Sequence, residues 1–229
     1  MLDSGRQLDA DRESMIAELW ATIAVKVLEM SVAARRGRAP DGFRLLGEGD
    51  NRIQEAFGAL EPRCRASALA LQRRPPFDPE DRGGRLDRES MRRGVRIEAI
   101  ASEHAGLANP FLRATQPHAR CGPVMGSALL LDRACAVLPG MPTGAGASTA
   151  WIVTRPDLVR MVCQLWDITY AASVPALRSP WPALTSRQLA VAQRAARGWT
   201  RAAIARDLGV SVRTVAGELH ELKPLLPLL

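Results

Sequence analysis

The residues best suited to chemistry in this chain lie close to its C-terminus. Thr185, Thr200 and Ser211 each precede a short run with apolar residues at helical spacing, where a hydroxyl can accept a hydrogen bond from the first free amides of a helix. Gly198 and Gly209 end the first two runs, as glycine commonly does at a helix C-terminus. This spacing predicts three short helices, and the glycine-containing turn before the third predicts a helix-turn-helix.

Such a unit can bind a DNA duplex through its third helix. The helix N-terminus offers amide groups and a positive dipole to phosphate, and the side chains of its first turns reach base edges in the major groove. The local charge agrees, because the residues from 184 to 229 hold fewer acidic than basic side chains, the basic ones being Arg187, Arg194, Arg197, Arg201, Arg206, Arg213 and Lys223. The structural alternative is three amphipathic helices that complete a hydrophobic core.

The segment 184–222 resembles the LuxR-type helix-turn-helix. The shared positions are Leu184-Thr185 with Arg187, Gly198 with Thr200, Ile204-Ala205, Leu208, Ser211 and Thr214-Val215. The resemblance implies a DNA-binding surface made of Thr185, Thr200, Arg201, Ser211, Arg213, Thr214, Ala216, Gly217 and His220. Within this set it implies that Ala216, Gly217 and His220 face base edges. The residues nearest the phosphates would be Thr185, Thr200, Ser211, Arg213 and Thr214.

The third helix departs from the LuxR-type pattern. The usual Thr-Val-Lys-x-His is replaced by Thr-Val-Ala-Gly-Glu at 214–218, so a lysine and a histidine are lost. Gly217 inside a helix costs about 1 kcal/mol relative to alanine, and Glu218 is expected to approach the DNA polyanion at a penalty. Pro224 and Pro227 cut off the fourth helix through which such domains pair. We therefore expect modest affinity from one copy, and a dimer or partner protein built elsewhere in the chain.

Residues 1–40 predict one long helix. Ile16, Trp20, Ile23, Val27 and Met30 recur in alternating steps of four and three, which is the spacing of a coiled-coil seam. One interpretation is a dimerisation helix in which these five side chains meet a second copy. The other is an amphipathic helix packed on its own domain. The sequence leaves both open and favours the dimer, because the C-terminal unit lacks its own pairing helix.

Short apolar strands alternate with helices between residues 41 and 174. This alternation predicts an α/β domain around a central sheet. Strands are expected at 43–46, 66–71, 95–99, 128–131, 134–138 and 151–153, and helices at 50–60, 85–93 and 156–169. Two loops rich in small residues, 103–116 and 139–148, are expected to line a ligand cleft, and the proline-rich stretch 175–183 is expected to be a stiff linker.

The middle domain resembles the sensor half of TrmB-like regulators, which is a degenerate phospholipase-D-like domain. The stretches 92–97 and 123–133 and the turn 73–76 carry this resemblance. Active phospholipase-D folds use His-x-Lys-x4-Asp, and aligning the aspartate with Asp132 puts Met125 and Ser127 at the other two places. Neither side chain can replace the histidine nucleophile or hold phosphate as lysine does. We therefore expect a turn role for Asp132 and a non-catalytic domain that senses a small molecule or a partner.

Composition adds little to this argument. The formal net charge is +7, but only Lys26 and Lys223 are lysines among the 31 basic residues, and GC-rich codons can raise arginine content without selecting a basic surface. The four cysteines form no CxxC pair, and His118, Cys121 and Cys135 lack an evident fourth zinc ligand. No metal, cofactor, secretion signal or membrane span is expected, so the chain is assigned to the cytoplasm.

The leading hypothesis is a transcriptional regulator that binds double-stranded DNA as a homodimer and is not an enzyme. A small-molecule effector or RNA polymerase is a further expected partner. The alternative is an interaction protein whose degenerate helix-turn-helix docks another regulator or RNA polymerase.

Overall fold

A mixed sheet organises the larger part of the molecule. Within residues 2–38, 40–75, 77–175 and 180–225, which the computed structural model describes, it has seven strands in the order β1-β7-β6-β5-β2-β3-β4. The strands are β1 (Phe43–Glu48), β2 (Ser67–Gln72), β3 (Arg96–Ser102), β4 (Arg120–Gly122), β5 (Ala128–Leu131), β6 (Cys135–Pro139) and β7 (Thr149–Val153). β2, β3 and β4 are parallel, and every other neighbouring pair is antiparallel.

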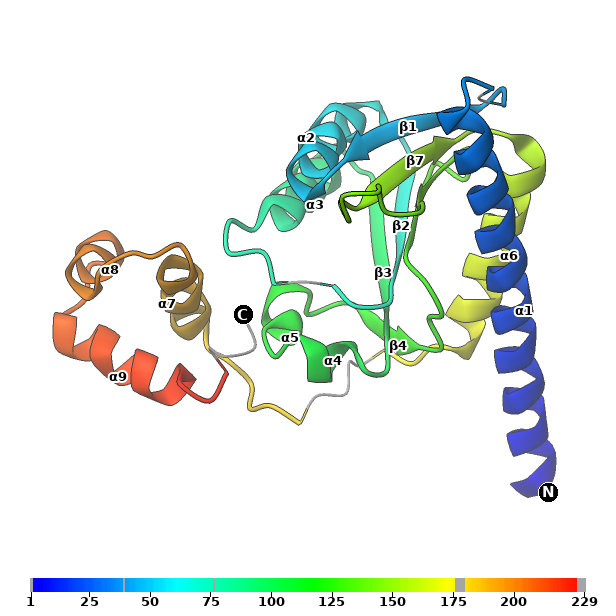
Figure 1. The fold of residues 1–229 in the computed structure, drawn as a ribbon. Helices are drawn as coiled ribbons and strands as arrows, with labels where there is room; N and C mark the ends of the chain where they lie inside the picture. The colour runs from blue at the N-terminus through cyan, green and yellow to red at the C-terminus, as the bar shows by residue number, and fades with distance from the viewer. Residues whose placement is uncertain (1, 39, 76, 176–179, 226–229) are drawn as a thin grey trace.

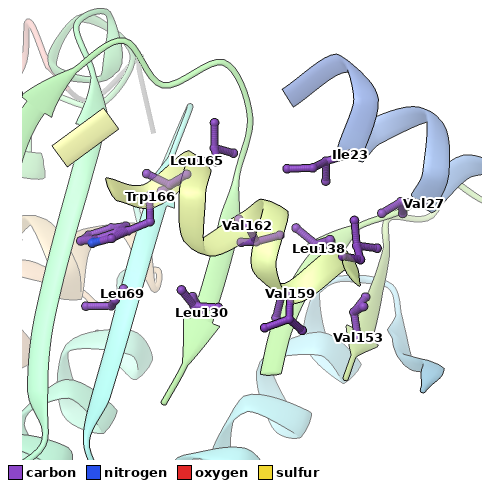
Figure 2. Close-up of a cluster of buried hydrophobic side chains, with 14 of the residues drawn as sticks. Ile23, Val27, Leu69, Leu130, Leu138, Val153, Val159, Val162, Leu165 and Trp166 are labelled. Carbon is purple, nitrogen blue, oxygen red and sulfur yellow. The ribbon is translucent and has the colours of Figure 1, made fainter. Parts of the chain in front are cut away.

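Helices cover both faces of this sheet (Figure 1). On one face lie α1 (Leu2–Arg35) and α6 (Pro156–Ala172), and the other face carries α2 (Asp50–Leu60), the short helix η1 (Glu61–Arg63) and α3 (Arg82–Arg92). The largest hydrophobic core lies under α6, where Val159, Val162 and Leu165 pack over Leu130 and Leu138 (Figure 2). The predicted α/β domain with a central sheet is therefore confirmed.

The apolar seam of α1 is covered within the chain. Ile16, Ile23 and Val27 are buried in the same core as α6, and Trp20 and Met30 are half-buried against it. Figure 2 shows Ile23 and Val27 on the side of α1 that faces α6. This corrects the dimerisation interpretation of these five side chains, because the structure shows the alternative, an amphipathic helix packed on its own domain. The two arrangements share one periodicity, so spacing alone could not separate them.

Asp132 organises the turn between β5 and β6. It and Arg133 adopt positive φ angles of 51° and 53°, and its carboxylate accepts hydrogen bonds from the amides of Arg65, Ala66 and Ser67 at 2.7–3.2 Å. Burial disfavours the charged carboxylate, but these amide donors more than offset that effect and hold the pKa of Asp132 below its usual range. Asp132 is thus a turn residue that joins two strands.

The two loops expected to line one cleft leave the same edge of the sheet at separate places, because β2 and β5 lie between β3 and β6. Loop 103–116 folds into two short helices, α4 (Ala105–Ala108) and α5 (Leu112–Thr115). Loop 139–148 contacts the end of α1, where the Arg35 guanidinium donates to the Met141 carbonyl at 2.6 Å. The structure thus gives no support to a cleft shared by the two loops.

Candidate nucleic-acid interface

Three capped helices form the C-terminal unit: α7 (Ser186–Ala196), α8 (Arg201–Leu208) and α9 (Val212–Leu222). Hydroxyl oxygens of Thr185, Thr200 and Ser211 accept hydrogen bonds from the third amide of each helix at 3.0–3.2 Å. At α7 the bond is reciprocal, because Gln188 Oε1 accepts from the Thr185 amide at 2.9 Å. Each hydroxyl satisfies an amide that would otherwise lack a partner, so the sequence itself fixes where each helix begins.

The three helices share one small core. Val191, Ala192, Ile204, Val215 and Leu222 are buried in it. Gly198 follows α7 and Gly209 follows α8, and both adopt left-handed backbone conformations, with φ of 78° and 65°. Glycine adopts this conformation without strain, so the chain can change direction sharply between the helices. Val191 and Ala192 form the buried side of α7, while Ala196, at its end, is exposed.

The outer side of α9 is exposed to solvent and is not covered by any part of the chain that the structure describes. Arg213, Gly217 and His220 are open to solvent, and they share one helix face because they are spaced by four and three residues. Thr214 and Ala216 are half-buried beside them. The other residues assigned to DNA contact are also exposed, namely Thr185, Thr200, Arg201 and Ser211. The third helix is therefore available to a duplex.

The polar groups near the start of α9 are partly engaged. The hydroxyls of Ser211 and Thr214 lie 2.8 Å apart and bond each other, while Ser211 Oγ also caps the helix. A Cβ at Gly217 would meet no heavy atom within 4 Å, so this position is a flat gap on the helix surface. Long side chains able to bond bases or phosphate are therefore confined to Arg213 and His220 on this face.

Glu218 requires a correction. It was expected to approach the DNA, but it is buried between α9 and α7, where Arg187 Nε donates to its carboxylate at 2.6 Å. A second link joins the same helices, because Gln188 Nε2 donates to Glu221 Oε2 at 2.7 Å. Glu218 therefore fastens the three-helix unit together instead of repelling phosphate.

One exposed aromatic residue was missed by the sequence analysis. Trp199, in the turn between α7 and α8, is 40% exposed, and the Arg197 guanidinium lies 4.9 Å from its ring centroid. Arg194 approaches the same ring at 6.0 Å and also pairs with Asp207. The signal available in the sequence was a tryptophan directly before a predicted helix cap and flanked by arginines. The Arg197–Trp199 pair extends the basic, exposed surface next to Thr200.

The middle domain lacks the phospholipase-D nucleophile at the expected place. Met125 is exposed, and the Ser127 hydroxyl accepts a hydrogen bond from the Arg73 amide at 3.2 Å, so it serves the backbone.

Among the described residues no group of three or more His, Cys, Asp or Glu side chains could hold a metal ion, and none of the helices is long and apolar enough to cross a membrane. Burial raises the pKa of the Cys64 thiol to about 11, and nearby Asp132 adds to this shift, so the thiol is a poor nucleophile.

Comparison with known proteins identifies the C-terminal unit. Residues 182–223 match the model of the homeodomain-like domain. The chain therefore carries a helix-turn-helix of the kind found in DNA-binding regulators. No curated protein matches the chain at a significant level.

Solved structures show distant likeness to the larger domain. Nuc from Salmonella typhimurium, a phospholipase D family member, is 12% identical with a TM-score of 0.41, over 59% of this chain and 99% of its own. The archaeal chromatin protein TrmBL2 is 12% identical with a TM-score of 0.47, over 75% and 69%. NucT from Helicobacter pylori is 10% identical with a TM-score of 0.46, over 58% and 99%. These values are too low to bear on what this chain binds or does.

Proposed function

We propose that this protein is a DNA-binding transcriptional regulator that acts in the cytoplasm. The observation that carries the proposal is the exposed outer side of α9, with Arg213 and His220 on one face beside the capped starts of three helices. Phosphates would lie near the hydroxyls and arginines at those starts, Arg213 included, and the His220 side chain would reach into the major groove. The LuxR-type pattern of 184–222 supports the same assignment of contacts.

The middle domain is proposed to be a non-catalytic, phospholipase-D-like sensor. Met125 and Ser127 stand where that enzyme family has histidine and lysine, and Asp132 is engaged by three backbone amides. A domain with this strand framework and without the nucleophile is suited to binding a small molecule or a protein partner. Catalysis is not part of the proposal.

A homodimer is proposed to form through the outward face of α1. This face carries apolar side chains that the chain itself does not cover, with Val25 54% and Leu28 41% exposed. Charge also favours a second copy in antiparallel orientation, because exposed Glu13 and Glu18 lie in the first half of the helix and exposed Arg36 follows its end. The first turns of α1 extend past α6 and have room to meet such a partner (Figure 1).

A second candidate is an interaction protein that docks another regulator or RNA polymerase. It rests on the thin base-reading surface at Ala216 and Gly217 and on the exposed side chains of Trp199 and Val212. Exposed aromatic and apolar groups are typical anchors of protein contacts. A stoichiometric protein partner recovered from cells, together with undetectable DNA binding by the protein alone, would favour it.

The test is fluorescence anisotropy with promoter fragments from the genomic neighbourhood of the gene. Wild-type affinity should fall steeply with salt, because each neutralised phosphate releases counterions. Arg213→Ala should weaken binding and lower the salt slope by about 1, as expected for one lost phosphate contact. Arg160→Ala, which removes an exposed arginine from α6, is the matched control and should change neither. An affinity that changes neither with salt concentration nor with Arg213→Ala would contradict the proposal.

A further inference from the structure

The core of the helix-turn-helix unit continues into the middle domain. Phe111, which lies between α4 and α5, is 0% exposed and belongs to the same hydrophobic cluster as Val191, Ile204 and Leu222. Phe77, from the segment after β2, is packed against this cluster, and its ring centroid lies 4.5 Å from that of Phe111. We call these two rings the aromatic platform. It is a point of contact between domains that are far apart in sequence.

Hydrogen bonds tie the platform to two strand ends. The Arg73 amide donates to Ser127 Oγ at 3.2 Å, and its carbonyl accepts from Ser102 Oγ at 2.6 Å. Asn109, which is buried, donates to the Pro75 carbonyl at 3.2 Å and accepts from the Phe111 amide at 3.0 Å. The segments that leave β2 and β3 are therefore fixed to each other just before each one delivers a phenylalanine.

The C-terminal unit meets this platform with the side opposite its exposed helix face. Leu222 and Leu225 are buried in the shared cluster, and Trp181 and Leu184, before α7, are half-buried against it. Figure 1 shows α7 as the helix of the unit that faces α5. Docking thus leaves Arg213 free while it fixes the direction in which α9 points.

We propose that the aromatic platform is a switchable docking surface for the helix-turn-helix unit. Through it, the segments that follow the C-terminal ends of β2 and β3 set the position of that unit. Ligands of open α/β sheets bind outside the C-terminal ends of the strands. Here the two segments that leave those ends carry Phe77 and Phe111. A conformational change in these segments that moves the two rings apart would remove the surface on which the helix-turn-helix unit rests. The coupling to DNA rests on the proposed function, but the docking itself does not.

The docking is tested without DNA, by hydrogen exchange of the full chain. Phe77→Ala should speed exchange about tenfold in residues 181–189 and 219–225, because the unit then opens from the platform more often. Asn109→Ala should act in the same direction, since it frees the Pro75 carbonyl and the Phe111 amide. Phe57→Ala is the matched control: it removes a half-buried ring from α2, at the core of β6 and β7, and should leave both segments unchanged.

Phe111→Ala empties a fully buried site and can disturb the middle domain, so Phe77→Ala decides the outcome. Unchanged exchange in 181–189 and 219–225 for Phe77→Ala would overturn the docking.

The coupling is tested with a saturating duplex. Allosteric coupling is reciprocal, so DNA bound to α9 should alter exchange in residues 73–75, 77–81 and 105–116 of the wild type, and this change should vanish in Phe77→Ala. A wild-type protein that binds DNA without any change in these segments would overturn the switch. Failure to bind DNA at all would count against the proposed function and leave the docking result standing.

Discussion

At the scale of single residues, Asp132 supports the turn between β5 and β6. Its carboxylate accepts hydrogen bonds from three backbone amides, while Met125 and Ser127 stand where the motif of active phospholipase-D folds has histidine and lysine. Asp132→Asn should lower the free energy of unfolding at pH 7 by about 1–3 kcal/mol, since the neutral side chain offers one oxygen and no charge to three amide donors. Urea unfolding measures this. Asp167→Asn, which alters an exposed aspartate on α6, is the control and should cost much less.

The same residue predicts a pH dependence. Its folded pKa is held below the unfolded value, which is about 3.9. Its contribution is therefore complete above that value and is lost as the pH falls through the folded pKa. The difference in unfolding free energy between wild type and Asp132→Asn should be constant from about pH 7 to pH 5 and shrink below about pH 4. A difference that grew on acidification would contradict the assigned role.

Glu218 lies on the proposed recognition helix, yet we expect its substitution to affect stability and not DNA affinity. Because its carboxylate is buried against Arg187, Glu218→Gln should weaken the three-helix unit and should not raise DNA affinity. Thermal unfolding and anisotropy with the same promoter fragments check the two parts. A gain in affinity of about tenfold, which corresponds to about 1.4 kcal/mol, would show that Glu218 faces the duplex after all.

At the scale of elements, two glycines make a matched pair of tests. Gly217 lies inside α9 with open space around its missing Cβ, so Gly217→Ala should stabilise the protein by about 1 kcal/mol. Gly126 is buried, and a Cβ there would collide with the indole ring of Trp20. Gly126→Ala should therefore destabilise the protein and loosen α1 from the sheet. Thermal unfolding of both variants checks the signs, and hydrogen exchange in α1 locates the second effect.

Local rules predicted most elements, and contacts between distant segments escaped them. The caps at Thr185, Thr200 and Ser211 depend on residues three positions away, so the sequence places them correctly. By contrast, one seam on α1 fits both a second copy and α6, because burial against either needs the same spacing. Phe111 sits among small residues and resembles a loop residue until the C-terminal unit covers it. Its partners in the C-terminal unit lie about seventy or more positions away, beyond any periodicity.

At the scale of the whole molecule, the two functional surfaces lie on opposite sides of the helix-turn-helix unit. One side buries Leu222 and Leu225 toward the aromatic platform, and the other exposes Arg213 and His220. The arrangement separates the proposed DNA surface from the contact with the middle domain. A change at the platform can therefore alter the orientation of α9 without altering its surface.

The proposed homodimer is a prediction at this scale. Val25 and Leu28 lie on the outward face of α1, while Ile23 and Val27 face the core, so the two faces can be changed separately. The double variant Val25→Lys with Leu28→Glu should convert a dimer to a monomer without loss of the fold, as light scattering and circular dichroism would show. Arg160→Glu, at an exposed position on α6 and away from this face, is the control and should leave the mass unchanged. We expect one recognition helix with only Arg213 and His220 as long DNA-facing side chains to bind weakly, so the monomeric variant should also lose most of its affinity for a site with two half-sites. A wild-type protein that is monomeric both free and on DNA would contradict this assembly and would require another source of affinity.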